Sequence, residues 1–178
     1  SLLKWIVVGP LLRGDIESAV KVFRRCVNEY NKTPAKQELL TELVKQASKS
    51  SPQHNQLLQD VYGLIDKVHG HNVTVTNLAI SLALCNKTNE LRNLIEKENI
   101  SADRLLSQVQ YLKEDDIVKA SWTMLEVGGE IFKGDLEPMC YLILTIYNEQ
   151  SDCKSAVELE EKMRKNGVTP GEDFRVVF

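Results

Sequence analysis

Helix-start signals recur along this chain at a nearly constant spacing. A polar residue that can cap a helix, or a proline that suits the first helical turn, precedes each of several apolar-periodic segments. The second helices of successive helical pairs start near Asp15, Pro52, Thr88, Asp115 and Asp152. The intervals between these starts are about 37, 36, 27 and 37 residues. Recurrence of a helical pair in the mid-thirties is typical of helical-repeat proteins. This period constrains the fold more than any single motif does.

The segment from Val73 to Asp103 illustrates one repeating unit. Two short helices with apolar stripes flank a polar turn at residues 86–89, where Thr88 is a suitable N-cap. A hairpin of this size cannot bury its own apolar faces, so it needs similar hairpins stacked against it. We therefore predict an all-α protein, a right-handed α-solenoid of about five helix-turn-helix repeats in one domain over residues 1–178. The hairpins are expected at roughly 1–30, 34–70, 73–99, 101–131 and 135–167, with the start of a further helix at 170–178.

Individual helix ends are also predictable. Thr33 is expected to cap a helix that has Pro34 at its first position, and Gly134-Asp135 resembles the earlier helix start at Gly14-Asp15. Trp5 lies among apolar residues and is expected in the core. Further N-caps are expected at Asp15, Ser101 and Asp152.

Composition indicates an ordered protein with few strongly charged surfaces. The 178 residues are 43% hydrophobic and 26% charged, and the longest apolar run, Met139 to Tyr147, is too short to cross a bilayer, so no membrane partner is expected. A formal charge of −3 disfavours a large phosphate-binding surface. Any RNA contact must therefore use a local patch. The clearest candidate is Lys21, Arg24 and Arg25, and a similar cluster is Lys162, Arg164 and Lys165; interspersed glutamates make a solvated helix face the alternative for both.

No pattern in the chain indicates catalysis or metal binding. The four cysteines lack paired spacing and are expected to be reduced and mostly buried. His69 and His71 flank Gly70, a spacing that does not place them on one helical face, and no Cys or Glu lies close by in sequence. There is no nucleophile elbow and no phosphate-cradling glycine loop. We expect no enzyme activity, no metal, no cofactor and no small-molecule substrate.

Three stretches resemble the pentatricopeptide-repeat family. They are VTVTNLAISLALCNKTNELRNLIEKENISAD at residues 73–103, GDIESAVKVFRRCVNEYNKTPAKQELL near the start, and SDCKSAVELEEKMRKNGVTPGEDF near the end. Leucine richness and irregular repeat lengths make the chain most similar to the leucine-rich mitochondrial members of that family in animals. The chain has no initiator Met and no recognisable presequence, so we expect it to be a fragment of such a protein.

The resemblance implies a non-catalytic module that binds single-stranded RNA and acts in mitochondrial mRNA stability and post-transcriptional gene expression. Within the family pattern, Asn77 matches the base-reading Asn, and Asp103 matches the acidic residue at the repeat end. Each also has a local interpretation, because Asn77 can bond to nearby backbone and Asp103 can interact with a helix dipole. Corresponding positions elsewhere fall near Leu40, near Leu142 and near Arg175 or Val176, so a base-by-base code is not intact.

A second function class remains open. The acidic balance and the degraded code positions favour a scaffold that binds protein, with RNA bound by repeats outside this chain. In a combined role the chain would hold a protein partner, such as an RNA-binding cofactor protein, and bind RNA weakly and in a salt-dependent way. The resemblance implies a mitochondrial location, with the nucleus or cytoplasm as alternatives.

Overall fold

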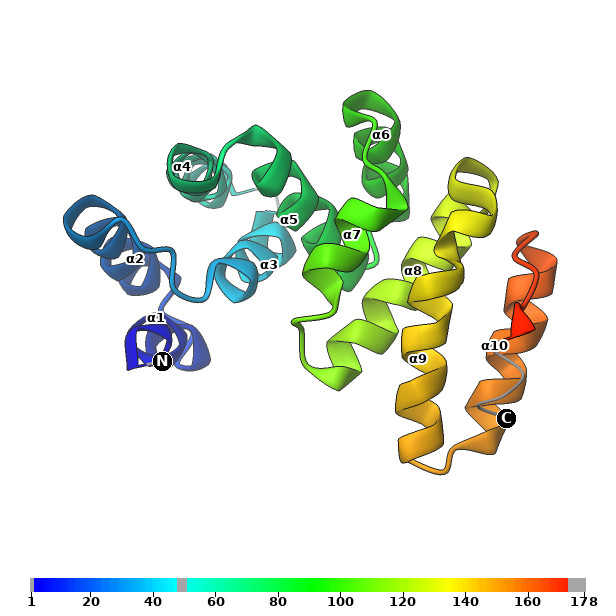
Figure 1. The fold of residues 1–178 in the computed structure, drawn as a ribbon. Helices are drawn as coiled ribbons and strands as arrows, with labels where there is room; N and C mark the ends of the chain where they lie inside the picture. Colours follow the sequence, from blue (N-terminus) through cyan, green and yellow to red (C-terminus); the bar gives the residue numbers. More distant parts are fainter. Residues whose placement is uncertain (1, 48–50, 173–178) are drawn as a thin grey trace. The chain divides into compact units, whose positions relative to one another are not determined.

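The computed structural model describes residues 2–47 and 51–172 of the chain. Within these residues it contains ten α-helices, one short 3-10 helix and no β-strand (Figure 1). The all-α prediction is confirmed, and the arrangement is consistent with an α-solenoid, while the number of repeats and the handedness stay predictions. The chain forms two compact units, residues 1–85 and 86–178. A single repeat domain of five hairpins likewise stays a prediction, and the further helix expected at 170–178 lies mostly outside the described residues.

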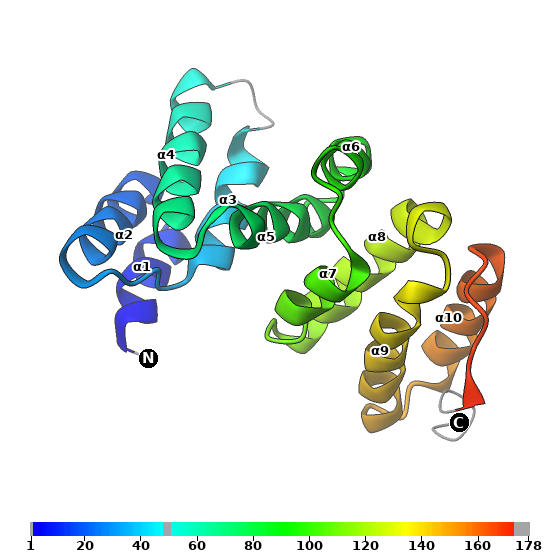
Figure 2. The same ribbon diagram turned by 45° about the horizontal axis from the view of Figure 1, so that its top comes forward.

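Unit 1 consists of two layers of helices. α1, α3 and α5 lie side by side in one layer, and α2 and α4 form the other (Figures 1 and 2). Their bounds are α1 Leu2–Leu12, α2 Ile16–Tyr30, α3 Lys36–Ala47, α4 Pro52–His69 and α5 His71–Leu84. Each helix of one layer packs against a helix of the other, so the apolar stripes meet in the middle. The resulting core contains Val7, Ile16, Ala19, Val20, Phe23, Val27, Ala35, Leu39, Leu40, Leu43, Val61 and Ile65.

Most helix ends in unit 1 follow the local sequence. Asp15 caps α2, because its Oδ1 accepts a hydrogen bond from the Ser18 N–H at 3.1 Å, as predicted. Pro52 occupies the first turn of α4. Gly70 ends α4 with a φ of 85°, a left-handed value that glycine adopts without steric cost, and α5 begins at the next residue. Two hairpins are thereby joined without a loop.

Two local expectations in unit 1 are wrong. The helix after Thr33 begins at Lys36, because Ala35 takes a positive φ of 56° and Pro34 lies in a turn. The Thr33 hydroxyl instead contacts Nε2 of His69 at 2.6 Å. Trp5 is not in the core: its side chain is 65% exposed on α1.

Unit 2 is arranged around its longest helix, α8. This helix contacts α6, α7, α9 and the 3-10 helix η1, and α9 packs against α10 (Figure 2). The bounds are α6 Thr88–Glu98, α7 Ala102–Val109, α8 Glu114–Phe132, η1 Lys133–Leu136, α9 Glu137–Glu149 and α10 Cys153–Lys165. Ser101 and Asp152 cap α7 and α10, as predicted. Two expected caps are wrong: Gly134-Asp135 lies inside η1, and Thr88 is the first residue of α6, after the N-cap Lys87. None of the described helices is both long and apolar enough to cross a membrane.

Several of the polar contacts within each unit join residues that are 36 positions apart. In unit 1 the pairs are Glu17 with Gln53, Arg24 with Asp60, and Thr33 with His69. In unit 2 they are Glu114 with Gln150 and Glu126 with Lys162. In these pairs, residues at equivalent positions of the predicted repeats meet across adjacent helices, as expected when similar hairpins stack.

Two glycines in helix interiors give a test of this packing. A Cβ at Gly129 in α8 would lie 2.7 Å from Cβ of Asn166 and 3.0 Å from its carbonyl oxygen, at the end of α10. We expect Gly129→Ala to lower the free energy of unfolding by about 1–3 kcal/mol, because α8 and α10 must move apart. Urea denaturation followed by circular dichroism measures this change.

Gly63→Ala is the matched control. Gly63 is exposed in the interior of α4, and a Cβ there meets no atom within 4 Å. Alanine is the better helix former, so this variant should gain roughly 0.5–1 kcal/mol. Equal effects of the two substitutions would contradict the close contact between α8 and α10.

The cysteines differ enough in burial to be distinguished chemically. None is in a disulfide, Cys26 and Cys140 are buried, and Cys153 is exposed. Burial, with a smaller effect of Glu137, raises the pKa of the Cys140 thiol to about 12. Since the thiolate is the nucleophile, iodoacetamide at pH 8 should modify Cys153 first and Cys140 last, as followed by mass spectrometry. Labelling in denaturant should equalise the rates, whereas fast labelling of native Cys140 would show that the α9 packing is wrong.

Candidate nucleic-acid interface

Asn77, the residue that matches the base-reading position, lies in the middle of α5. Its side chain is fully buried, and its backbone carbonyl accepts a hydrogen bond from Gln37 Nε2 at 3.0 Å. Contact between this side chain and a base would require a change in the packing around α5. The base-reading role of Asn77 therefore stays a prediction, with this structural condition attached.

A polar network connects α5 to α3 beside Asn77. Gln37 Nε2 donates to Ser81 Oγ at 2.8 Å, and the hydroxyls of Ser81 and Thr41 lie 2.9 Å apart. Thr41 also donates to the carbonyl of Gln37 at 2.7 Å, and Cys85 Sγ donates to the carbonyl of Thr41. Because buried polar groups cost free energy unless they are hydrogen-bonded, these contacts fix how α3 and α5 meet.

Asp103 lies in unit 2, in the first turn of α7. It is exposed and follows the N-cap Ser101, whose Oγ accepts from the Arg104 N–H at 3.2 Å. A carboxylate here interacts favourably with the positive end of the helix dipole and is also open to solvent. The exposure leaves Asp103 able to accept a hydrogen bond from a ligand, and its pairing with Asn77 stays a prediction.

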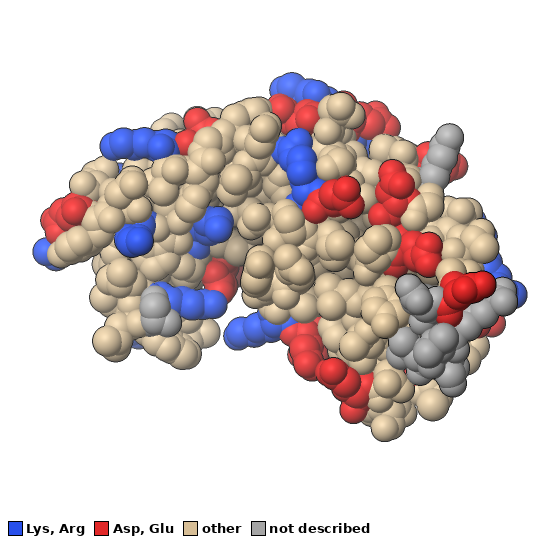
Figure 3. All heavy atoms as spheres, viewed as in Figure 1, with Lys and Arg blue, Asp and Glu red and all other residues tan. Residues whose placement is uncertain are grey.

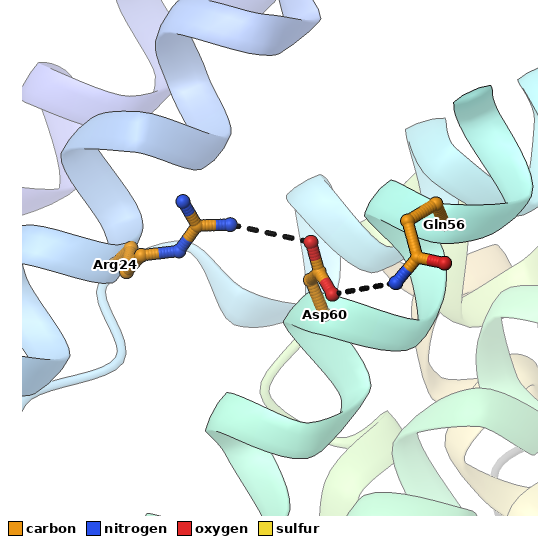
Figure 4. Close-up of polar contacts among 3 residues, drawn as sticks. All are labelled: Arg24, Gln56 and Asp60. Atoms are coloured by element: carbon orange, nitrogen blue, oxygen red, sulfur yellow. Dashed lines mark hydrogen bonds and ion pairs between the residues drawn. The ribbon is translucent and has the colours of Figure 1, made fainter.

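The basic cluster on α2 is largely neutralised by carboxylates. Arg24 Nη2 lies 3.3 Å from Asp60 Oδ2 on α4, and Gln56 donates to the other oxygen of Asp60 at 3.0 Å (Figure 4). Arg25 pairs with Glu29 one turn later, at 3.0 Å. Lys21 is exposed and forms no ion pair within residues 2–47 and 51–172. Of the predicted cluster, Lys21 is the most available to a phosphate.

The second basic cluster, on α10, is also paired. Lys162 lies 3.2 Å from Glu126 on α8, and Arg164 lies 2.6 Å from Glu160 in its own helix. Surface pairs of this kind contribute little to stability, but each places a negative charge beside the cation. These residues are weak candidates for binding an anion.

Charge is distributed unevenly between the two units. Residues 1–85 contain 10 Lys and Arg against 7 Asp and Glu, a formal charge of +3, whereas residues 86–178 contain 12 against 18, a formal charge of −6. In Figure 3, Lys and Arg side chains lie over α2, α3 and α4 of unit 1 with fewer acidic ones between them, and acidic side chains are more frequent over unit 2. Unit 1 is the better surface for a polyanion.

One edge of unit 1 gathers cationic groups that local sequence clustering did not reveal. We call Lys32, Lys36, Lys67, His69 and His71 the basic edge. Lys32 lies in the α2–α3 connection, Lys36 begins α3, Lys67 and His69 lie in the last turn of α4, and His71 begins α5. All are exposed except Lys36, which is partly buried. The contact of Thr33 with His69 brings the two connections together.

Two members of the basic edge, Lys36 and His69, have lowered pKa values. Burial lowers the pKa of Lys36, and nearby Glu38 partly opposes this. Burial also lowers the pKa of His69, and the positive charge of Lys36 lowers it further. Both effects favour the neutral forms, and an anion placed between the two groups would offset them.

The sequence contains a signal for this edge, but a search for basic residues that are adjacent in sequence does not find it. NKTPAK at residues 31–36 and KVHGHN at residues 67–72 are offset by 36 positions, so each occupies the same place in consecutive repeats. Comparing repeats position by position identifies both as basic connections. Among the described residues, no group of three or more His, Cys, Asp and Glu side chains is placed to hold a metal.

Two known proteins that are similar to this chain have the same name in different organisms. The chain is 24% identical over 171 residues to the leucine-rich PPR motif-containing protein, mitochondrial, of Xenopus tropicalis, and 22% identical over 176 residues to that of Mus musculus. Each match covers 94% of this chain and 12% of the relative, so the chain spans about an eighth of the length of these relatives. No family model and no solved structure matches. Nearly the whole chain is thus similar to a segment of leucine-rich PPR motif-containing mitochondrial proteins, and the resemblance drawn from its motifs is confirmed.

Proposed function

We propose that this chain is a non-catalytic helical-repeat module that binds single-stranded RNA and acts in mitochondrial mRNA stability and post-transcriptional gene expression. The similarity to leucine-rich PPR motif-containing mitochondrial proteins supports this proposal most directly. Helical repeats of this family class present side chains from successive units to successive bases, which suits an extended single strand. The mitochondrial location follows from the names of the same relatives.

The distribution of charge supports RNA contact by unit 1. Its formal charge is +3 although the whole chain is at −3, so the positive potential is local. Lys21, Arg24 and Arg25 are candidate phosphate contacts, and Asn77 and Asp103 are candidate base contacts. Because the carboxylates of Asp60 and Glu29 compete for two of these cations, we propose moderate affinity with a strong dependence on salt.

A single binding experiment tests the proposal. Fluorescence anisotropy with labelled homopolymeric and mixed single-stranded RNAs across a salt series should give micromolar affinity at low salt, falling steeply as salt rises. Asn77→Ala should change the order of preference among bases, because the amide that offers both a donor and an acceptor is removed. Double-stranded RNA of the same sequence should bind more weakly.

Asn77→Ala also perturbs a buried site, so it needs a structural control. Ser81→Ala removes a neighbouring buried hydroxyl of α5 that bonds to Gln37 and leaves Asn77 in place. If both variants change base preference equally, the effect comes from α5 packing and not from base reading. If the folded wild-type chain binds no RNA even at low salt, a protein-binding scaffold role replaces the proposal, and affinity capture of protein partners is the next experiment.

A further inference from the structure

We propose that the basic edge of unit 1 binds the phosphate backbone of the RNA, with Lys32, Lys36 and Lys67 as its principal contacts. This inference rests on the proposed function and adds the path of the strand across unit 1. It assigns the main electrostatic contact to the connections between repeats, away from the α2 cluster that the sequence singles out.

The first argument is the availability of the cations. Within residues 2–47 and 51–172, Lys32, Lys36 and Lys67 form no ion pair, whereas Lys4 pairs with Glu38 at 2.5 Å and both arginines of α2 pair with carboxylates. A phosphate that binds Arg24 competes with Asp60 for the guanidinium group. A phosphate at Lys32, Lys36 or Lys67 displaces no paired carboxylate.

The second argument is the absence of carboxylates along the same backbone. Residues 30–37 and 67–85 contain no Asp or Glu. The charged neighbours are Glu38, which is held by Lys4, and Asp66, which is partly buried in α4 just before Lys67. The polar side chains of residues 31–36 and 67–72 are those of lysine, histidine, asparagine and threonine. A negatively charged strand meets little repulsion there.

The third argument is geometric. The basic connections 31–36 and 67–72 occupy the same place in successive repeats, and the 2.6 Å contact of Thr33 with His69 holds them side by side. α3 and α5 both begin on this edge, so the positive ends of their helix dipoles reinforce the lysines. A ligand with negative charges at regular intervals fits such a repeated pattern better than a single small anion does.

The closing experiment compares two triple variants that change net charge equally. Lys32→Gln, Lys36→Gln and Lys67→Gln together remove three positive charges from the edge. Lys21→Gln, Arg24→Gln and Arg25→Gln together remove three from α2. Net charge changes by the same amount in both, so a difference in affinity does not come from net charge and reports where the phosphates bind. Thermal unfolding by circular dichroism confirms that each variant is folded before RNA binding is measured.

We expect the edge variant to bind single-stranded RNA at least about tenfold more weakly than wild type. The slope of log affinity against log salt concentration should become less steep by roughly two units, because three phosphate contacts are lost. The α2 variant should lose less than about threefold. Equal losses in the two variants, or a larger loss in the α2 variant, would overturn the assignment.

Protection of lysines in the unmodified protein gives an independent measurement. Acetylation followed by mass spectrometry should show Lys32, Lys36 and Lys67 shielded by bound RNA, with Lys21 reacting as it does in the free protein. Shielding of Lys21 with an unprotected edge would contradict the inference even if a variant misfolds. RNA binding without edge protection refutes only the path of the strand, whereas no RNA binding at all refutes the proposed function.

Discussion

The stacking of equivalent hairpins is the constraint on which the structure depends. A helical hairpin of this size cannot bury its own apolar faces, so helices pack both within and beyond their own hairpin. α3 packs against α4 and α5, and α2 packs against α1 and α4. The polar pairs Arg24 with Asp60 and Glu126 with Lys162, each 36 positions apart, are surface contacts that result from this stacking. The same stacking decides function, because it neutralises some cations and brings others together. The packing of α2 against α4 that pairs Arg24 with Asp60 also brings Lys32 and Lys67 to the same edge.

Much of the fold was predictable, because local signals and the tertiary arrangement agree. The caps Asp15, Ser101 and Asp152 act as expected, since an N-cap depends on the few residues that follow it. The start at Pro34 was not predictable, because Ala35 adopts a left-handed conformation that alanine rarely takes without tertiary support. Trp5 was misplaced because an apolar neighbourhood in sequence does not specify which face of α1 is covered.

The candidate site was less predictable than the fold. The motif around Asn77 identifies a position in a repeat, but only the packing of α5 reveals that this side chain is buried. Adjacency in sequence selected Lys21, Arg24 and Arg25, yet Asp60 of another helix pairs with Arg24 and Glu29 of the same helix pairs with Arg25. The basic edge escapes a search for clustered lysines, because its members are about one repeat apart and meet only after the chain has turned back through α3 and α4.

The network of Gln37, Thr41 and Ser81 has a consequence for the order of the repeats. Leucine-lined helix faces are nearly interchangeable, so apolar burial alone would let one hairpin stack on several others. The buried hydroxyl of Ser81 on α5 bonds to Gln37 and Thr41 of α3, and an apolar neighbour in place of α3 would remove both bonds. The polar groups therefore specify which hairpin is the neighbour, while the apolar faces hold the hairpins together. An array built this way cannot be shuffled or shortened at this junction without losing its alignment.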